Sequence, residues 1–188
     1  WLIITRMHAE DGWPEDKMER RKDEIIAVAN AYDLTATHQL DFKAAQLDTV
    51  PLGDLVGAIG QVIKSVEPTE VLIPHRGDAH SDHACVHDAT AACAKWFRYP
   101  SVKELLVYET LSETDAGLQD LAPFNPNVFI DISGFIEKKL EITTLFGDEI
   151  QDFPFPRSLE AIKALATLRG AASGTHAAEA FMLLRARV

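Results

Sequence analysis

The chain has 188 residues, enough for one domain with a sizeable hydrophobic core. Hydrophobic residues make up 47% and charged residues 25%, as in ordinary globular proteins, and no apolar run is long enough to span a bilayer. The formal net charge of -11 argues against a nucleic-acid partner, because a phosphate backbone would be repelled.

Short apolar runs alternate with amphipathic segments along the chain, and this alternation predicts one α/β domain over residues 1–188. Strands are expected at 1–5, 35–42, 69–74, 102–109 and 127–133. Helices are expected at 15–34, 48–68, 81–97, 134–146, 158–170 and 175–187, the last with a strand over part of it as the alternative. Ser81 and Ser158 are the predicted N-caps, and Gly170 is the predicted end of its helix. Such alternation is typical of a mostly parallel sheet covered by helices on both faces.

Three polar loops follow strands of the predicted sheet: "ITRMHAEDG", "PHRGDAHSDH" and "ETLSETD". In open α/β sheets, ligands bind at the carboxyl ends of the strands. The three loops are therefore expected to meet at one edge of the sheet and to form a site there.

The second of these loops is dense in groups that bind metals and transfer protons. Asp78, His80, Asp82 and His83 lie within six positions, and His83 and His87 are spaced to share one helix face. Neutral imidazole and carboxylate are ligands that Zn²⁺ accepts, whereas the alternative is a solvated helix N-terminus whose polar side chains cap backbone amides. An aspartate beside a histidine also fixes the ring tautomer, so Asp82 is expected to orient His80 for oxyanion stabilisation or proton transfer.

In this loop the sequence resembles the second signature of the LmbE-like, PIG-L-type N-deacetylases, which ends in His-x-Asp-His, as His80, Asp82 and His83 do here. These proteins are zinc hydrolases that remove acetyl from N-acetylglucosaminyl groups. The resemblance extends over nearly the whole chain, through "ERRKDEIIAVANAYDL", "LDFKAAQLDTVP", "YETLSETD", "FNPNVFIDISGFIEKK" and "FPFPRSLEAIKALATLRGAASGTHAAEAF".

The resemblance implies a role for each matching residue. His83 would be a metal ligand, and His80 would stabilise the tetrahedral intermediate and assist the leaving amine, with Asp82 orienting it. Arg21 matches an arginine that contacts substrate in some relatives. Three further residues are expected on the substrate side: Asp78, Glu109 and Arg157. An ordinary surface role is the alternative for Glu109, and a surface or ion-pair role is the alternative for Arg157.

Two departures from the family pattern stand out. The first signature, His-Pro-Asp-Asp-Glu, which would supply two metal ligands and the general base, is absent from the sequence. The resemblance therefore implies that a strand, that loop and a helix precede Trp1, unless His75, Asp78 or His87 substitutes as a ligand. Ala44 also stands where many relatives carry an aspartate, which removes one expected sugar contact.

The sequence as a whole therefore predicts a Rossmann-like, three-layer α/β fold and a zinc-dependent deacetylase of acetamido sugars or similar small conjugates. The alternatives are a non-catalytic sugar-binding module and an amide hydrolase with another substrate. A homo-oligomer is expected. The free thiols of Cys85 and Cys93, roughly 12 Å apart on one helix, fit a cytoplasmic protein. Trp96 and Phe97 are predicted to pack in the core, and His75 and His87 to support the site.

Overall fold

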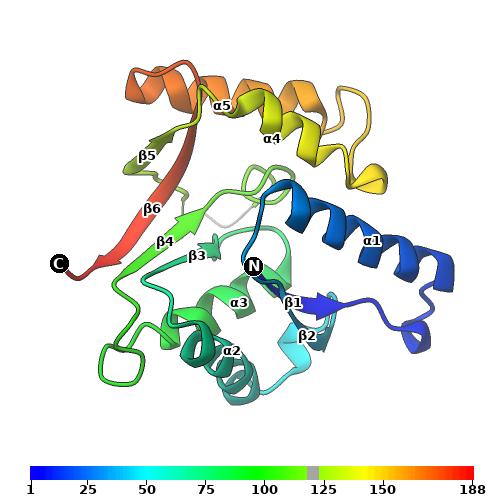
Figure 1. Ribbon diagram of the computed structural model, residues 1–188, viewed down its shortest axis with the longest axis vertical. Helices are drawn as coiled ribbons and strands as arrows, with labels where there is room; N and C mark the ends of the chain where they lie inside the picture. The colour runs from blue at the N-terminus through cyan, green and yellow to red at the C-terminus, as the bar shows by residue number, and fades with distance from the viewer. Residues whose placement is uncertain (118–122) are drawn as a thin grey trace. The chain divides into compact units, whose positions relative to one another are not determined.

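The computed structural model describes residues 1–117 and 123–188 (Figure 1). Strands and helices alternate along most of the chain, which confirms the predicted α/β class. No helix among these residues is both long and apolar enough to cross a membrane. The elements are, in chain order, β1 (Leu2–Arg6), α1 (Glu15–Ala31), β2 (His38–Lys43), α2 (Leu52–Val66), β3 (Glu70–Pro74), α3 (Ser81–Ala92), β4 (Glu104–Tyr108), β5 (Val128–Asp131), α4 (Ile136–Thr143), α5 (Leu159–Ser173) and β6 (Ala178–Ala186).

Backbone contacts divide the chain into two compact units. The first consists of Trp1–Asp41 and Phe129–Glu179, and the second of Phe42–Val128 and Ala180–Val188.

The second unit is built on a sheet of buried apolar strands. β3 pairs with β4 in parallel, from Glu70↔Glu104 to Pro74↔Tyr108, and β4 pairs with β6 in antiparallel orientation. The full strand order is β3-β4-β6-β5. Ile73 and Val107 are almost fully buried, which explains why these strands read as continuous apolar runs rather than alternating ones. Helices α2 and α3 pack against each other, and α3 also contacts β3 (Figure 1).

In the first unit, β1 and β2 form a two-stranded sheet, and α4 packs against α5. The buried face of α5 carries Ile162 and Ala166. Gly170 is on the same helix, at the point where the segment after α5 passes close to it. A Cβ atom at residue 170 would lie 2.7 Å from the carbonyl oxygen of Thr175. Glycine at this position therefore permits a close approach between α5 and the segment that leads into β6.

Two sequence predictions about these elements need correction. The helix expected over residues 175–187 is wrong, and the alternative, a strand over part of this range, is confirmed: Ala178–Ala186 form β6, whose apolar run pairs with β4 inside a sheet. The Ser158 cap of α5 is confirmed, with its hydroxyl accepting from the Ala161 N–H at 3.2 Å, but the helix continues past Gly170 to Ser173. Gly174, with φ +81°, provides the left-handed residue that ends it.

Trp96 and Phe97 also differ from their prediction. Helix α3 ends at Ala92, so both residues lie beyond the helix and do not continue its buried face. Their exposed fractions are 61% and 63%, which excludes the expected core role.

Candidate active site

The candidate site is in the second unit, in the loop between β3 and α3. His80 is the N-cap of α3, and its Nδ1 accepts a hydrogen bond from the backbone N–H of Asp82 at 3.2 Å. The predicted cap, Ser81, is instead the first residue of the helix. An imidazole that accepts at Nδ1 carries its proton on Nε2 when neutral, so His80 presents an N–H donor at the far side of its ring.

His83 has the opposite arrangement. Its Nδ1 lies 2.6 Å from Oδ2 of Asp78, a side chain with no exposed surface. A carboxylate can only accept, so the ring proton is on Nδ1 and Nε2 keeps its lone pair. The two rings stack, with centroids 5.2 Å apart and an interplanar angle of 15°. In this stacked pair, His80 can donate a hydrogen bond from Nε2–H, and His83 can bind a metal or a proton through the lone pair of Nε2.

Asp78 is itself held by a residue from the loop after β4. The hydroxyl of Thr114 donates to Oδ1 of Asp78 at 2.6 Å and accepts from the backbone N–H of Thr110 at 2.8 Å. The expectation that Asp78 contacts substrate does not fit a fully buried carboxylate that holds a histidine and a threonine. Asp78 is a positioning residue for His83.

The loop after β4 and the loop after β3 are joined at further points. The Ala79 N–H donates to the carbonyl oxygen of Glu113 at 3.0 Å. A Cβ atom on Gly117 would lie 2.3 Å from the carbonyl oxygen of Gly77, so only glycine permits this approach. Thr114 was missed by the sequence reasoning, although its loop was recognised as polar and placed at a strand end. Residues 118–122 of the same predicted loop lie outside the described residues.

Asp82 does not have the role predicted for it. Its carboxylate accepts from the backbone N–H groups of Ala45, at 2.7 Å, and Leu47, at 3.1 Å, and the residue is buried. Asp82 contacts His80 through its own N–H, with the ring as acceptor. The carboxylate therefore fixes the segment after β2, and a carboxylate–imidazole pair is found between Asp78 and His83 instead.

The neighbouring histidines are also engaged. His87 Nδ1 lies 2.9 Å from the carbonyl oxygen of Pro74, at the end of β3. His75 is buried, with the ring of Phe124 edge-on at 5.5 Å between centroids. Glu109 directly follows β4 and is partly exposed.

The described part of the chain provides one suitable metal ligand but not a complete metal-binding site. His83 offers a bare Nε2 on a ring oriented by a buried carboxylate, which is the usual arrangement of a metal-binding histidine. Within residues 1–117 and 123–188, however, no three His, Cys, Asp or Glu side chains come together as a metal-binding group. The substitution of His75, Asp78 or His87 as further ligands is therefore not supported.

Two other predicted residues lie in the first unit, where Glu149 brings them together. Arg21 Nη2 lies 2.6 Å from Oε1 of Glu149, and Arg157 Nη2 lies 3.2 Å from Oε2. Each guanidinium also lies over a phenylalanine ring, Phe146 for Arg21 and Phe155 for Arg157. The ion-pair alternative considered for Arg157 thus describes its contacts in the structure.

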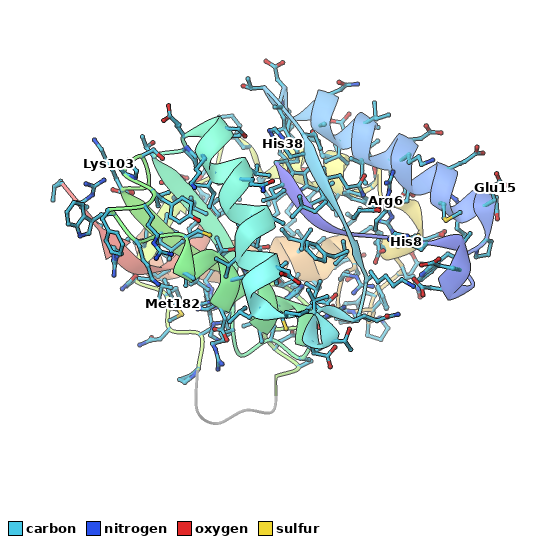
Figure 2. The ribbon with its side chains drawn as sticks, turned by 90° about the horizontal axis from the view of Figure 1, so that it is seen from below. Arg6, His8, Glu15, His38, Lys103 and Met182 are labelled. Carbon is cyan, nitrogen blue, oxygen red and sulfur yellow. The ribbon has the colours of Figure 1, made fainter. Side chains whose placement is uncertain are left out.

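Arg21 also lines a cavity of about 310 Å³ within the first unit. Its wall includes basic and acidic side chains, among them Arg6 and Asp41, whose atoms Nη1 and Oδ1 are 3.1 Å apart. Figure 2 shows Arg6 and His8 beside the strands of this unit.

Comparison with known families supports the resemblance seen in the sequence. Residues 4–94 match the family model described as PIG-L, GlcNAc-PI de-N-acetylase. No curated protein matches the sequence.

Solved structures with the same fold include proteins with different reactions. A conserved protein of Thermus thermophilus is 22% identical, with a TM-score of 0.76 over 100% of this chain and 82% of that one. The N,N'-diacetylchitobiose deacetylase of Pyrococcus horikoshii is 14% identical, with a TM-score of 0.76 over 98% and 72%. The 4-carboxy-2-hydroxymuconate hydratase of Pseudomonas putida is 16% identical, with a TM-score of 0.70 over 100% and 85%. Residues 4–94, just under half of the chain, are thus similar to the PIG-L family, and the described residues have the fold of these solved structures.

Proposed function

We propose that the protein is a metal-dependent hydrolase that removes an N-acetyl group from an acetamido sugar or a related small conjugate. The observation that carries the proposal is the stacked pair of His80 and His83, whose rings are fixed in opposite tautomers by their Nδ1 partners. The family description and the deacetylase among the structural neighbours agree with this reaction.

His83 would hold the metal, zinc in the first instance, through Nε2. A bound divalent metal lowers the pKa of a water ligand and polarises the acyl carbonyl. Asp78 would strengthen the ligand by accepting from Nδ1, because a carboxylate partner raises the basicity of an imidazole. Thr114 would keep Asp78 in place.

His80 would act on the acyl group and the leaving amine. Its Nε2–H can donate to the oxygen on which negative charge develops, which is the largest single contribution in many acyl-transfer enzymes. The same nitrogen can pass a proton to the amine as the C–N bond breaks. The described residues show no carboxylate placed to take the proton of the attacking water, so no base is assigned.

Arg21, Arg157 and Glu109 are proposed to bind the substrate. The two arginines share Glu149, which leaves each of them oriented and within a mixed-charge surface. A substrate hydroxyl or carboxylate would add to this network as a further acceptor. For each of the three residues, the corresponding alanine variant should raise KM more than it lowers kcat.

The decisive experiment measures acetate release from N-acetylglucosamine, N,N'-diacetylchitobiose and N-acetylglucosaminyl conjugates, with the protein loaded with Zn²⁺ or treated with a chelator. The proposal predicts metal-dependent acetate release that His80→Ala slows by roughly a hundredfold or more. The control His176→Ala should preserve it, since His176 is exposed and lies outside the site. Sugar binding without acetate release would indicate a non-catalytic module. Turnover of an unsaturated carboxylate by hydration, with no acetate from any conjugate, would indicate the reaction of the hydratase neighbour.

A further inference from the structure

Two adjacent aromatic side chains are exposed in the turn that follows α3. Trp96 and Phe97 have exposed fractions of 61% and 63%, and their rings meet edge to face with centroids 6.0 Å apart. Single exposed apolar side chains are ordinary on protein surfaces, but two large neighbouring rings suggest a contact surface. Neither residue takes part in the candidate active site.

Basic side chains contact the short segment that carries these rings. The guanidinium of Arg98 lies 5.8 Å from the centroid of Phe97, and the guanidinium of Arg185 donates to the carbonyl oxygen of Ala94 at 3.0 Å. The Lys64 ammonium lies 5.6 Å from the centroid of Tyr99. The Arg187 guanidinium donates to the carbonyl oxygen of Pro100.

Six of the eight Lys and Arg residues of the second unit belong to this region, which we call the aromatic–basic corner together with Trp96 and Phe97. All six are exposed. Figure 2 shows Lys103 extending from the outside of this unit. The six are Lys64, Lys95, Arg98, Lys103, Arg185 and Arg187.

The charge of the corner is largely uncompensated. None of its six cations forms an ion pair with a carboxylate in the part of the chain that the structure describes. Two acidic residues begin the neighbouring strands β3 and β4, Glu70 and Glu104, and they are opposite each other in the parallel register. The chain as a whole carries a net charge of -11, so this concentration of cations runs against its composition.

We propose that the aromatic–basic corner binds the surface of an anionic phospholipid membrane. Tryptophan and phenylalanine settle at the level of the headgroups, and lysine and arginine pair with lipid phosphates while their stems cover apolar surface. Such a surface accepts protruding rings without needing a matching groove. The interaction is peripheral and is independent of the deacetylase activity proposed above.

Charge complementarity distinguishes this partner from a second copy of the chain. A symmetric dimer through the corner would bring the same cations face to face, and like charges opposed across an interface are unfavourable. A nucleic acid would offer phosphates, but the net charge of -11 repels a long polyanion that extends beyond the corner.

Vesicle co-sedimentation of the full chain tests the proposal. The protein should bind vesicles of equimolar phosphatidylcholine and phosphatidylglycerol, and not vesicles of phosphatidylcholine alone. Replacing Lys95, Arg98 and Lys103 with glutamine should weaken binding by about a hundredfold, at about fivefold for each charge. Raising NaCl from about 0.05 to 0.5 M should weaken it as well, because the Debye length shortens.

The aromatic contribution has its own matched control. Trp96→Ala with Phe97→Ala should lower affinity about tenfold or more. Trp13→Ala with Phe135→Ala removes an exposed tryptophan and an exposed phenylalanine of the first unit, and should leave binding unchanged. Far-ultraviolet circular dichroism establishes that both double variants are folded.

Tryptophan fluorescence gives a second readout. With Trp1 and Trp13 changed to phenylalanine, Trp96 is the single tryptophan of the chain, and its emission should move to shorter wavelength when anionic vesicles are added. Absence of binding to anionic vesicles at low salt would overturn the proposal, as would binding that both corner variants retain. A dimer in sedimentation velocity that Trp96→Ala disrupts, without any vesicle binding, would assign the corner to self-association instead.

Discussion

The Nδ1 atom of His83 lies 2.6 Å from a carboxylate oxygen of Asp78, whose side chain has no exposed surface. One residue before His83 in the helix, the backbone N–H of Asp82 donates to the ring of His80. The two neighbouring imidazoles are therefore held by partners of opposite character, an acceptor for His83 and a donor for His80. This contrast fixes which nitrogen of each ring is available for chemistry.

The tautomers are directly measurable. In ¹⁵N-labelled protein at mildly alkaline pH, two-bond ¹H–¹⁵N spectra should show His83 protonated at Nδ1 and His80 protonated at Nε2. Thr114→Val should weaken the preference of His83, because Oδ1 of Asp78 loses its hydroxyl donor, whereas Thr114→Ser should retain it. Equal tautomer populations of His83 in the wild type would contradict the role given to Asp78.

Alanine variants of the two histidines should differ in their effects on bound metal and on kcat. His83→Ala should lose bound metal and acetate release together, because it removes the proposed ligand. His80→Ala should keep metal but lower kcat by roughly a hundredfold or more, as loss of an oxyanion donor does. Metal content by elemental analysis and acetate release at saturating substrate check both variants, with His176→Ala as control. A His80→Ala protein with wild-type kcat would exclude His80 from the chemistry.

The order of the elements could be predicted from the sequence because the apolar runs have clear periods and caps. Ser158 capped its helix as expected, and the run "VLIP" formed β3 directly before the polar loop. Residues 175–187 left a helix and a partial strand as alternatives, because a run rich in alanine and leucine suits a helix when no sheet partner is known. Pairing with β4 decides for the strand. Trp96 and Phe97 were misplaced because helix α3 stops before them.

The candidate site was predicted in its location but not in its pairing. The density of histidine and aspartate after β3 predicted a site in this loop, and the structure brings the rings of His80 and His83 together there. Which carboxylate contacts which ring depends on the turn between Asp78 and Asp82, and adjacency in sequence suggested the wrong pair. Thr114 comes from a separate loop, and no local pattern relates it to Asp78.

Asp82→Ala should reduce stability and not only activity. The buried carboxylate accepts two backbone N–H bonds, from Ala45 and Leu47, and charge-assisted bonds of this kind contribute about 1.5–3 kcal/mol each. The expected loss of unfolding free energy is about 3–6 kcal/mol for the two bonds together, measured by urea denaturation. Asp88→Ala is the matched control on the same helix, because its ion pair with Arg76 is exposed to solvent and should contribute little to stability. Wild-type stability for Asp82→Ala would argue that the carboxylate does not anchor the segment after β2.

Tyr108 should make the second unit sensitive to alkaline pH. Burial, and then the nearby charge of Asp78, raise the pKa of Tyr108 from 10.0 to about 12. Between these values the folded protein keeps a proton that the unfolded chain has lost, so the free energy of unfolding falls as pH rises from 10 towards 12. The loss amounts to roughly 3 kcal/mol at most, because a shift of one pKa unit corresponds to about 1.4 kcal/mol.

Tyr108→Phe has no phenol to ionise, so its free energy of unfolding should not show this fall at alkaline pH. Urea midpoints at pH values of about 9 and 11 test the difference, with Tyr32→Phe as the control, since the Tyr32 ring is 47% exposed and its pKa is raised less far by burial and by Glu179. The difference in stability between the two pH values should therefore shrink clearly in Tyr108→Phe and only slightly in Tyr32→Phe. Equal losses of unfolding free energy in wild type and Tyr108→Phe over this range would contradict the prediction. The phenol of Tyr108 would then ionise as readily in the folded chain as in the unfolded one, and its burial would not explain the loss of stability at alkaline pH.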